Sequence, residues 1–166
     1  TQEDIYKIYD YKTANYTFAS PLTMGATLAG AKPRQIKKLY SYGMLLGRAF
    51  QIKDDISGTF GAVKKTGKSN LTDIQEAKRT LLVWHAYNHA QKKDRLMIKK
   101  IMQNKVTKDA ELIKMRQIII NTGSLAYAQE QIKCLCLQAL KQLQGLTMNQ
   151  KYKQTLDNFS RQIFKF

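Results

Sequence analysis

The sequence predicts an all-α fold. Its 166 residues are rich in Leu, Ile, Lys, Gln and Ala, a composition that favours helix. Apolar residues recur at three- and four-residue steps, and few segments alternate as strands do. The hydrophobic content of 43% is sufficient for a core, and no internal repeat or linker is visible. We therefore expect a single all-α region over residues 1–166.

The first predicted helix covers residues 2–18 and is followed by a short apolar segment. Glu3 and Asp4 are acids of the kind that suit a helix N-terminus. Pro21 is expected to interrupt the chain. Residues 22–31 are small and apolar, which suits close packing between helices but weakens the intrinsic preference for helix.

The next helix is expected to begin at Pro33, a residue allowed in a first turn, and to run to Asp55. Its apolar face comprises Ile36, Leu39, Tyr40, Gly43, Leu46, Gly47 and Phe50. At about 100° per residue, Gln51 and Asp54 share one face with Gly47. The apolar face therefore becomes polar at its C-terminal end, as the wall of a cavity with a polar mouth would.

Residues 57–72 break the helical pattern. Three Gly together with Ser, Thr and Asn predict an exposed loop, with Thr72 and Asp73 as the cap of a further turn. Helical periodicity returns in five later segments, at residues 75–91, 94–104, 107–121, 124–143 and 149–163. Thr107 is the expected N-cap of the third of these. One face of the fourth comprises Leu125, Ala128, Ile132, Leu135, Ala139 and Leu143.

Composition excludes several classes of protein. Two Cys exclude a disulfide scaffold, and Cys134 and Cys136 are expected to be free thiols of a reducing, cytoplasmic compartment. No apolar run approaches the roughly 18 residues of a membrane helix, so stable insertion is not expected. His85 and His89 have the spacing of zinc ligands but lack a third ligand nearby, which favours a structural role.

The charge is the unusual feature. The formal net charge of +16 indicates an anionic partner, which could be nucleic acid, a membrane surface or a phosphorylated small molecule. The basic residues at 92–116 are expected to form solvated faces.

Asp54 and Asp55 are the only acidic residues from Tyr11 to Thr72, a stretch that holds ten basic residues. Adjacent carboxylates repel each other unless cations surround them. Mg²⁺ would suit them, because it takes one or two carboxylates together with substrate phosphates. The alternative is an ordinary helix end with a solvated acid pair, and composition alone favours that alternative.

A lysine-rich loop follows the acid pair and contains Lys64, Lys65 and Lys68. Such a loop can close over a metal-bound phosphate, with each lysine acting as a point charge. A solvated loop is the alternative. The segment is not a P-loop, because Ala62 stands where the first glycine of that motif belongs.

Three ordered segments are distinctive: YKTANYTFASPLTMGATLAGA at 11–31, YGMLLGRAFQIKDDISGTFG at 42–61 and TGKSNLTDIQEAKRTLLV at 66–83. Together they resemble the C-terminal half of trans-isoprenyl diphosphate synthases, the polyprenyl synthetase family. The resemblance is clear over residues 11–83. Three motifs in the correct order are much more specific than any one of them.

The resemblance implies a helical bundle around a deep cavity, with two aspartate-rich motifs that hold Mg²⁺ at its mouth. In this family an allylic diphosphate loses its diphosphate and is attacked by isopentenyl diphosphate, which extends the chain head to tail. The full-length enzyme is usually a homodimer. Gly43 and Gly47 would let helices or the substrate approach closely.

The resemblance also implies the site residues. Asp54 and Asp55 match the start of the second aspartate-rich motif, with Asp54 the main metal ligand and Asp73 a later acid that supports the metal. The expected diphosphate-binding residues are Lys12, Thr13, Gln51, Lys68 and Lys78. Lys12 and Lys68 are expected to act in catalysis together with the acid pair.

Two departures from the family pattern qualify this expectation. Gly58 replaces the last carboxylate of the second motif. The chain also reads as the C-terminal half of such an enzyme without the first aspartate-rich motif, so we expect it to be inactive alone. The alternatives are a non-catalytic homologue or partner subunit of a heteromeric synthase, and a basic helical nucleic-acid-binding module.

Overall fold

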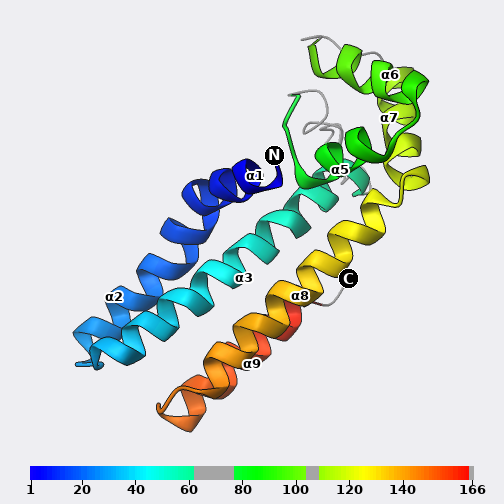
Figure 1. Cartoon of the computed structure of the whole chain (residues 1–166). Helices are drawn as coiled ribbons and strands as arrows, with labels where there is room; N and C mark the ends of the chain where they lie inside the picture. The colour runs from blue at the N-terminus through cyan, green and yellow to red at the C-terminus, as the bar shows by residue number, and fades with distance from the viewer. Residues whose placement is uncertain (62–76, 104–108, 165–166) are drawn as a thin grey trace. The chain divides into compact units, whose positions relative to one another are not determined.

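A computed structural model describes residues 1–61, 77–103 and 109–164, and these ranges contain helices and no strand (Figure 1). The all-α prediction is confirmed. The helices are α1 (Gln2–Tyr9), η1 (Asp10–Ala19), α2 (Ser20–Leu28), α3 (Pro33–Phe60), α5 (Leu81–His89), α6 (Lys92–Gln103), α7 (Asp109–Asn121), α8 (Ser124–Gln144) and α9 (Gln150–Phe164).

The chain divides into two compact units. The first consists of Thr1–Ile5 and Ile52–Gln129, and the second of Tyr6–Gln51 and Glu130–Phe166. In the first unit α5, α6 and α7 pack against one another. Its fully buried large side chains are Ile52, Leu81, Leu82, Ile98, Ile101, Leu112, Met115, Ile118 and Ile119.

In the second unit, α3 is the element to which the others attach. Its Tyr42 hydroxyl donates to the Leu156 carbonyl of α9 at 2.9 Å, and its Lys38 ammonium donates to the Gly145 carbonyl after α8 at 2.6 Å. The predicted face of α8 is confirmed, because Leu125 is half-buried and the other five residues of that face are buried. These five are Ala128, Ile132, Leu135, Ala139 and Leu143.

Three predictions for the first 31 residues are wrong in detail. From Asp10 the first helix continues as a π-helix, in which the Ser20 amide donates to the Asn15 carbonyl five residues earlier. Pro21 does not interrupt the helical path, because it is the second residue of α2, which follows η1 without a break. No residue of α2 is fully buried, so the burial of this segment does not bear out the close packing expected of it.

Other boundaries also differ. Helix α3 continues to Phe60, so the loop predicted from residue 57 is wrong for its first four residues. The helix predicted at 75–91 begins only at Leu81. Thr80 is its N-cap, and the Thr80 side chain accepts a hydrogen bond from the Val83 amide. The remaining loop residues, the Thr72–Asp73 cap and the Thr107 cap lie outside the described residues.

The two cysteines are free thiols, as expected. Cys134 is exposed and Cys136 is buried, and neither forms a disulfide. None of the described helices combines the length and apolar character that crossing a membrane requires.

Candidate functional site

The eight predicted site residues fall on several elements. Lys12 and Thr13 lie on η1, in the second unit, as does Gln51 on α3. The first unit holds the other three described residues, which are Asp54, Asp55 and Lys78. The two remaining predicted residues, Lys68 and Asp73, lie outside the described part of the chain.

Thr13 and Gln51 are brought together. The Thr13 hydroxyl donates to the Oε1 atom of Gln51 at 2.5 Å, and the two residues are only 7% and 3% exposed. A buried hydroxyl and carboxamide are costly to desolvate unless each is hydrogen-bonded, so this bond sets the orientation of both. Lys12, the neighbour of Thr13, is exposed. The pair therefore attaches the Lys-Thr segment to α3 and leaves the lysine accessible to an anion.

Close backbone contact between η1 and α3 makes this hydrogen bond possible. A Cβ atom built on Gly43 would lie 2.6 Å from the Cα atom of Ala19, and one built on Gly47 would overlap the backbone of Ala14. Real Cβ atoms do not approach so closely, so both positions of α3 require glycine. The predicted role of these two glycines in helix approach is confirmed. Ten-residue η1 is π-helical, a conformation that is often found at functional sites.

An ion pair that we did not predict reinforces the same contact. The Arg48 guanidinium donates to both carboxylate oxygens of Asp10, at 2.5 and 2.6 Å, and lies over the ring of Tyr6. The hydrogen bond to Asp10 is the main cause that raises the pKa of Arg48. Asp10 is the first residue of η1, two positions before Lys12. The available signal was that Asp10 is the last acid before Asp54.

The acid pair lies near the C-terminal end of α3, in the first unit. Asp54 is exposed, whereas Asp55 is only 2% exposed. The predicted polar face paired Gln51 with Asp54, but the carboxylate that is buried like Gln51 is Asp55, four residues further on. An accessible carboxylate suits a hydrated cation, and the metal-ligand role that the resemblance implies for Asp54 stays a prediction.

The donor set fits magnesium better than a transition metal. Within the described ranges, no three His, Cys, Asp or Glu side chains gather as they would in a metal site made entirely by protein. Mg²⁺ does not require such a site, because it retains waters and binds one or two carboxylates together with substrate phosphates. Asp54 and Asp55 have side chains of the type that could hold such an ion.

Helix α7 caps the end of α3 that carries the acid pair. The Arg116 guanidinium donates to the Thr59 carbonyl at 2.5 Å, which satisfies one of the last carbonyls of α3. Arg116 is half-buried, so the prediction of a solvated face is wrong at this position.

Lys78, another predicted site residue, is also half-buried and follows Ala77, whose φ of 50° lies in the left-handed region.

The two histidines have a structural environment. The His85 ring stacks between His89 and Tyr127, with ring centroids 3.9 and 4.2 Å away. Its Nδ1 atom lies 2.9 Å from the Ser124 hydroxyl. Burial and the neighbouring His89 lower the pKa of His85. These contacts agree with the predicted structural role.

Comparison with known proteins agrees with the resemblance seen in the sequence. The profile of the family described as polyprenyl synthetase matches residues 1–119. The geranylgeranyl diphosphate synthase of Saccharolobus solfataricus is 32% identical over 151 residues, which are 91% of this chain and 45% of that enzyme. The geranylfarnesyl diphosphate synthase of Aeropyrum pernix is 36% identical over 110 residues, or 66% of this chain and 33% of that enzyme.

Solved structures agree as well. A geranylgeranyl pyrophosphate synthase from Corynebacterium glutamicum, complexed with isoprenyl diphosphate and magnesium, superposes with a TM-score of 0.92 at 30% identity. The match covers 99% of this chain and 47% of that one. The chain therefore spans about half the length of the relatives it matches.

Proposed function

The chain belongs to the polyprenyl synthetase family, and we propose that it supplies one wall of the active site of a Mg²⁺-dependent prenyl diphosphate synthase. The reaction joins an allylic diphosphate to isopentenyl diphosphate head to tail. The proposal extends to a cytoplasmic homodimer in the full-length enzyme, without a nucleic-acid partner.

The observation that carries the proposal is the buried hydrogen bond from Thr13 to Gln51. It attaches the Lys-Thr segment to α3, the same helix that carries Asp54 and Asp55 one turn after Gln51. Two of the three motifs that resemble the family are thus connected by a specific contact, although they are 38 residues apart.

The roles follow from the charges of these side chains. Asp54 would hold Mg²⁺ as the accessible carboxylate, and Asp55 and Asp73 would support it. When bound, Mg²⁺ supplies positive charge that stabilises the departing diphosphate. Lys12, Lys68 and Lys78 would bind diphosphate oxygens as point charges, assisted by the hydroxyl of Thr13 and the carboxamide of Gln51.

Isothermal titration of the 166-residue chain with geranyl diphosphate tests the proposal. We expect binding that requires Mg²⁺ and that falls at least about tenfold in Asp54→Asn, because a charge-assisted interaction is worth about 1.5–3 kcal/mol. Asp109→Asn removes an exposed carboxylate in the first turn of α7 and should leave binding unchanged. Binding that is independent of Mg²⁺, or equal in both variants, would contradict the proposal.

A second candidate is a non-catalytic partner subunit of a heteromeric synthase, and Gly58 favours it. This glycine stands on the last turn of α3 where the family motif has its third carboxylate. The test uses the full-length protein. If that protein condenses its substrates in a Mg²⁺-dependent reaction, it is an enzyme, and Gly58→Asp should raise its apparent affinity for Mg²⁺. If it shows no such condensation by itself, the role of partner subunit is supported.

A further inference from the structure

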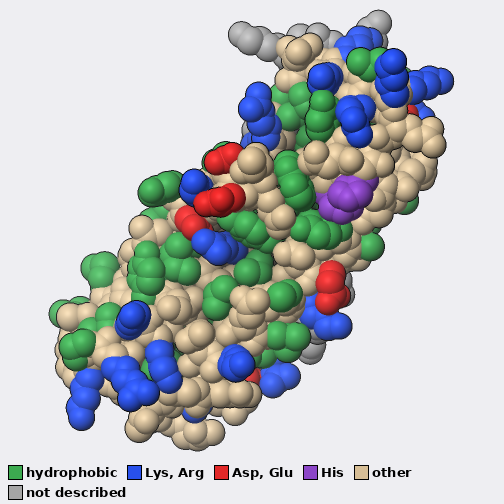
Figure 2. Space-filling view, viewed as in Figure 1, with side chains coloured by type: hydrophobic (Ala, Val, Ile, Leu, Met, Phe, Trp, Pro, Cys, Tyr) green, Lys and Arg blue, Asp and Glu red, His purple; other side chains and the backbone are tan. Residues whose placement is uncertain are grey.

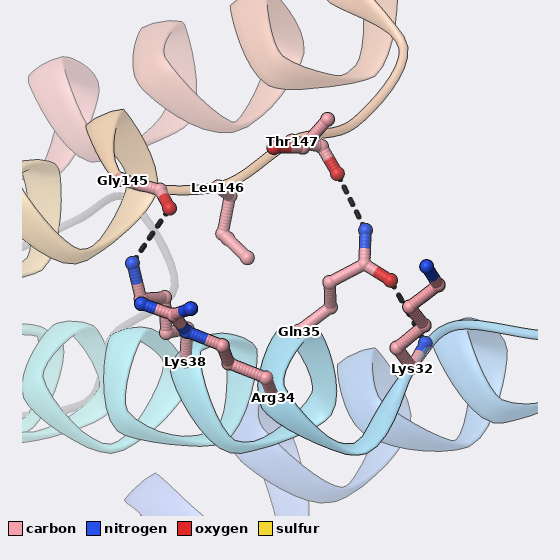
Figure 3. A pocket seen from close by; sticks show the side chains of 7 residues that line it. All are labelled: Lys32, Arg34, Gln35, Lys38, Gly145, Leu146 and Thr147. Atoms are coloured by element: carbon pink, nitrogen blue, oxygen red, sulfur yellow. Dashed lines mark hydrogen bonds between the residues drawn. The ribbon is translucent and has the colours of Figure 1, made fainter.

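A pocket opens at the N-terminal end of α3, within the second unit. It has a volume of about 520 Å³ and is lined by the start of α3 and by the loop between α8 and α9 (Figure 3). Three of its lining residues are basic, Lys32, Arg34 and Lys38, and none is acidic. From Arg34 to Gln51 the helix rises by about 25 Å, so this pocket is distinct from the Thr13–Gln51 contact.

Two side chains of α3 hold the far wall of the pocket in place. Lys38 donates to the Gly145 carbonyl at 2.6 Å, and Gln35 donates through Nε2 to the Thr147 carbonyl at 2.5 Å. Figure 3 shows Leu146 between these two hydrogen bonds, with its side chain directed toward α3. The loop is therefore fixed against the helix by polar contacts on both sides, and the pocket is part of the fold of this unit.

Lys32 and Arg34 do not fix the loop in this way. Among the described residues, neither side chain makes a hydrogen bond or an ion pair, and both residues are exposed. Clustering like charges without a counter-charge destabilises a protein, so an unneutralised group of this kind is expected to attract an anion.

The surrounding chain offers no acid to neutralise them. No acidic residue occurs between Asp10 and Asp54 or between Glu130 and Asp157, and the pocket is built entirely from these two stretches. In Figure 2 basic side chains gather at the end of the second unit where α2 meets α3, without an acidic side chain among them. Of the three acids in the second unit, Asp10 and Asp157 are paired with Arg48 and Arg161.

The first turn of α3 adds one backbone donor. Lys32 precedes Pro33 at the N-cap position, and lysine has no acceptor with which to satisfy the first amides of the helix. The Gln35 side chain accepts from the Lys32 amide at 2.8 Å, and the Gln35 and Ile36 amides donate to the Lys32 carbonyl at 2.8 and 3.1 Å. Pro33 has no amide hydrogen, so among the described contacts the Arg34 amide is the donor of this turn that remains for an anion. Helix dipole and side-chain charge therefore have the same sign at this pocket.

We propose that this pocket binds an anion of the phosphate class, either a free phosphate or diphosphate or the phosphate of an anionic lipid headgroup. Arg34 and Lys32 provide the charge-assisted donors, and the backbone amide of Arg34 at the start of α3 adds one further donor. The proposal is independent of the function proposed above, since it involves none of the residues assigned to the allylic diphosphate.

Nitrogen-15 NMR of the 166-residue chain, titrated with inorganic pyrophosphate, tests the pocket directly. Saturating shifts are expected at Arg34, Gln35 and Leu146. Lys32→Gln/Arg34→Gln should weaken binding by about tenfold or more, because two charge-assisted donors are lost. Lys38 is left unchanged, since its hydrogen bond to Gly145 closes the pocket.

A parallel sedimentation experiment distinguishes the two sources of phosphate. The chain is mixed with phosphatidylcholine vesicles, with and without phosphatidylglycerol. Pyrophosphate binding without sedimentation indicates a soluble ligand. Sedimentation that requires phosphatidylglycerol and is lost in the double variant indicates a lipid headgroup. Either result supports the proposal.

Lys92→Gln/Lys93→Gln is the matched control, because it removes the same charge from two exposed positions on α6. The proposal is overturned if both double variants weaken binding equally, if the shifts spread over exposed lysines without saturating, or if neither probe binds. The mapped shifts are measured on the unsubstituted chain, so the test does not depend on the stability of a variant.

Discussion

Lys12 and Thr13 are neighbours in the chain but have opposite environments. The lysine is exposed and the threonine is 7% exposed, with its hydroxyl bonded to Gln51. The two residues therefore have different roles. The threonine fixes the segment to α3, and the lysine remains accessible. In the proposed function this division keeps a cation in a defined place for the diphosphate.

Thr13→Val tests the anchoring role of the hydroxyl. The substitution keeps the shape of the side chain but leaves the Gln51 Oε1 atom without this donor in a buried environment. We expect the free energy of unfolding to fall by about 1–3 kcal/mol in urea denaturation. Thr155→Val, an exposed position on α9, should change it by less than about 0.5 kcal/mol. Equal stability of the two variants would argue against the anchor.

The ion pair between Asp10 and Arg48 could not be predicted from the sequence. Each is an ordinary charged residue in its own helix, and no local pattern relates positions that are 38 residues apart. Their pairing becomes apparent only when η1 lies against α3. The same separation joins Thr13 to Gln51, and there the family resemblance identified both residues without predicting that they touch.

The glycines of α3 act through helix packing. Two of them, Gly43 and Gly47, face Ala19 and Ala14 of η1, and the space between the helices admits no further atom. Glycine lowers the stability of an isolated helix, so its repeated use here is explained by the contact with η1.

Gly47→Ala and Gly25→Ala form a matched pair of substitutions. At Gly47 the added methyl group overlaps the Ala14 backbone, and overpacking of this kind is expected to cost about 1–3 kcal/mol. At Gly25 of α2 nothing lies within 4 Å, so alanine should stabilise the helix by about 0.5–1 kcal/mol. Thermal denaturation followed by circular dichroism measures both. Similar shifts of the same sign would contradict the close packing.

Tyr42 connects α3 to α9 and makes the stability of this contact dependent on pH. Burial raises its pKa to about 12, although the hydrogen bond with Ser160 acts in the opposite direction. The raised pKa means that the folded state keeps the phenol proton more tightly than the unfolded state does. The contribution is therefore complete below about pH 10 and is lost as the pH rises towards about 12.

The prediction is that stability declines between about pH 10 and about pH 12 more steeply in the wild type than in Tyr42→Phe. Urea denaturation at each pH gives the free energy of unfolding. Tyr152→Phe, which removes an exposed tyrosine of α9, should follow the wild type. A wild-type slope equal to that of Tyr42→Phe would show that Tyr42 does not cause the decline.

The net charge of +16 is unevenly distributed along the chain. Acidic residues are absent from two long stretches that build much of the second unit, whereas several basic residues elsewhere have partners, such as Lys100 with Glu111. Repulsion among the unpaired cations destabilises the compact state, and salt screens that repulsion.

Sodium chloride is therefore expected to stabilise the protein. Raising it from about 20 mM to about 200 mM shortens the screening length from roughly 20 Å to roughly 7 Å. We expect Tm, followed by circular dichroism, to rise by about 2–5 °C. Lys92→Glu/Lys93→Glu replaces two positive charges by negative ones and should reduce the rise. A Tm that falls with salt would mean that ion pairs outweigh the repulsion.

Helix positions were predicted well where the cause is local. The face of α8 follows from apolar spacing alone, and α3 begins at Pro33 as its first-turn preference requires. The π-helical η1 and the late start of α5 were not predicted, because hydrogen bonding five residues apart and a cap at Thr80 compete with regular helix at small differences in energy.

The candidate site divides in the same way. The order of the motifs and the types of their residues can be read directly from the sequence. They were enough to predict the family, the acid pair and the Lys-Thr segment. The buried state of Asp55, the Asp10–Arg48 pair and the basic pocket at the start of α3 depend on contacts between distant segments. Such contacts are decided by how helices pack and desolvate one another, and no local pattern encodes that energy.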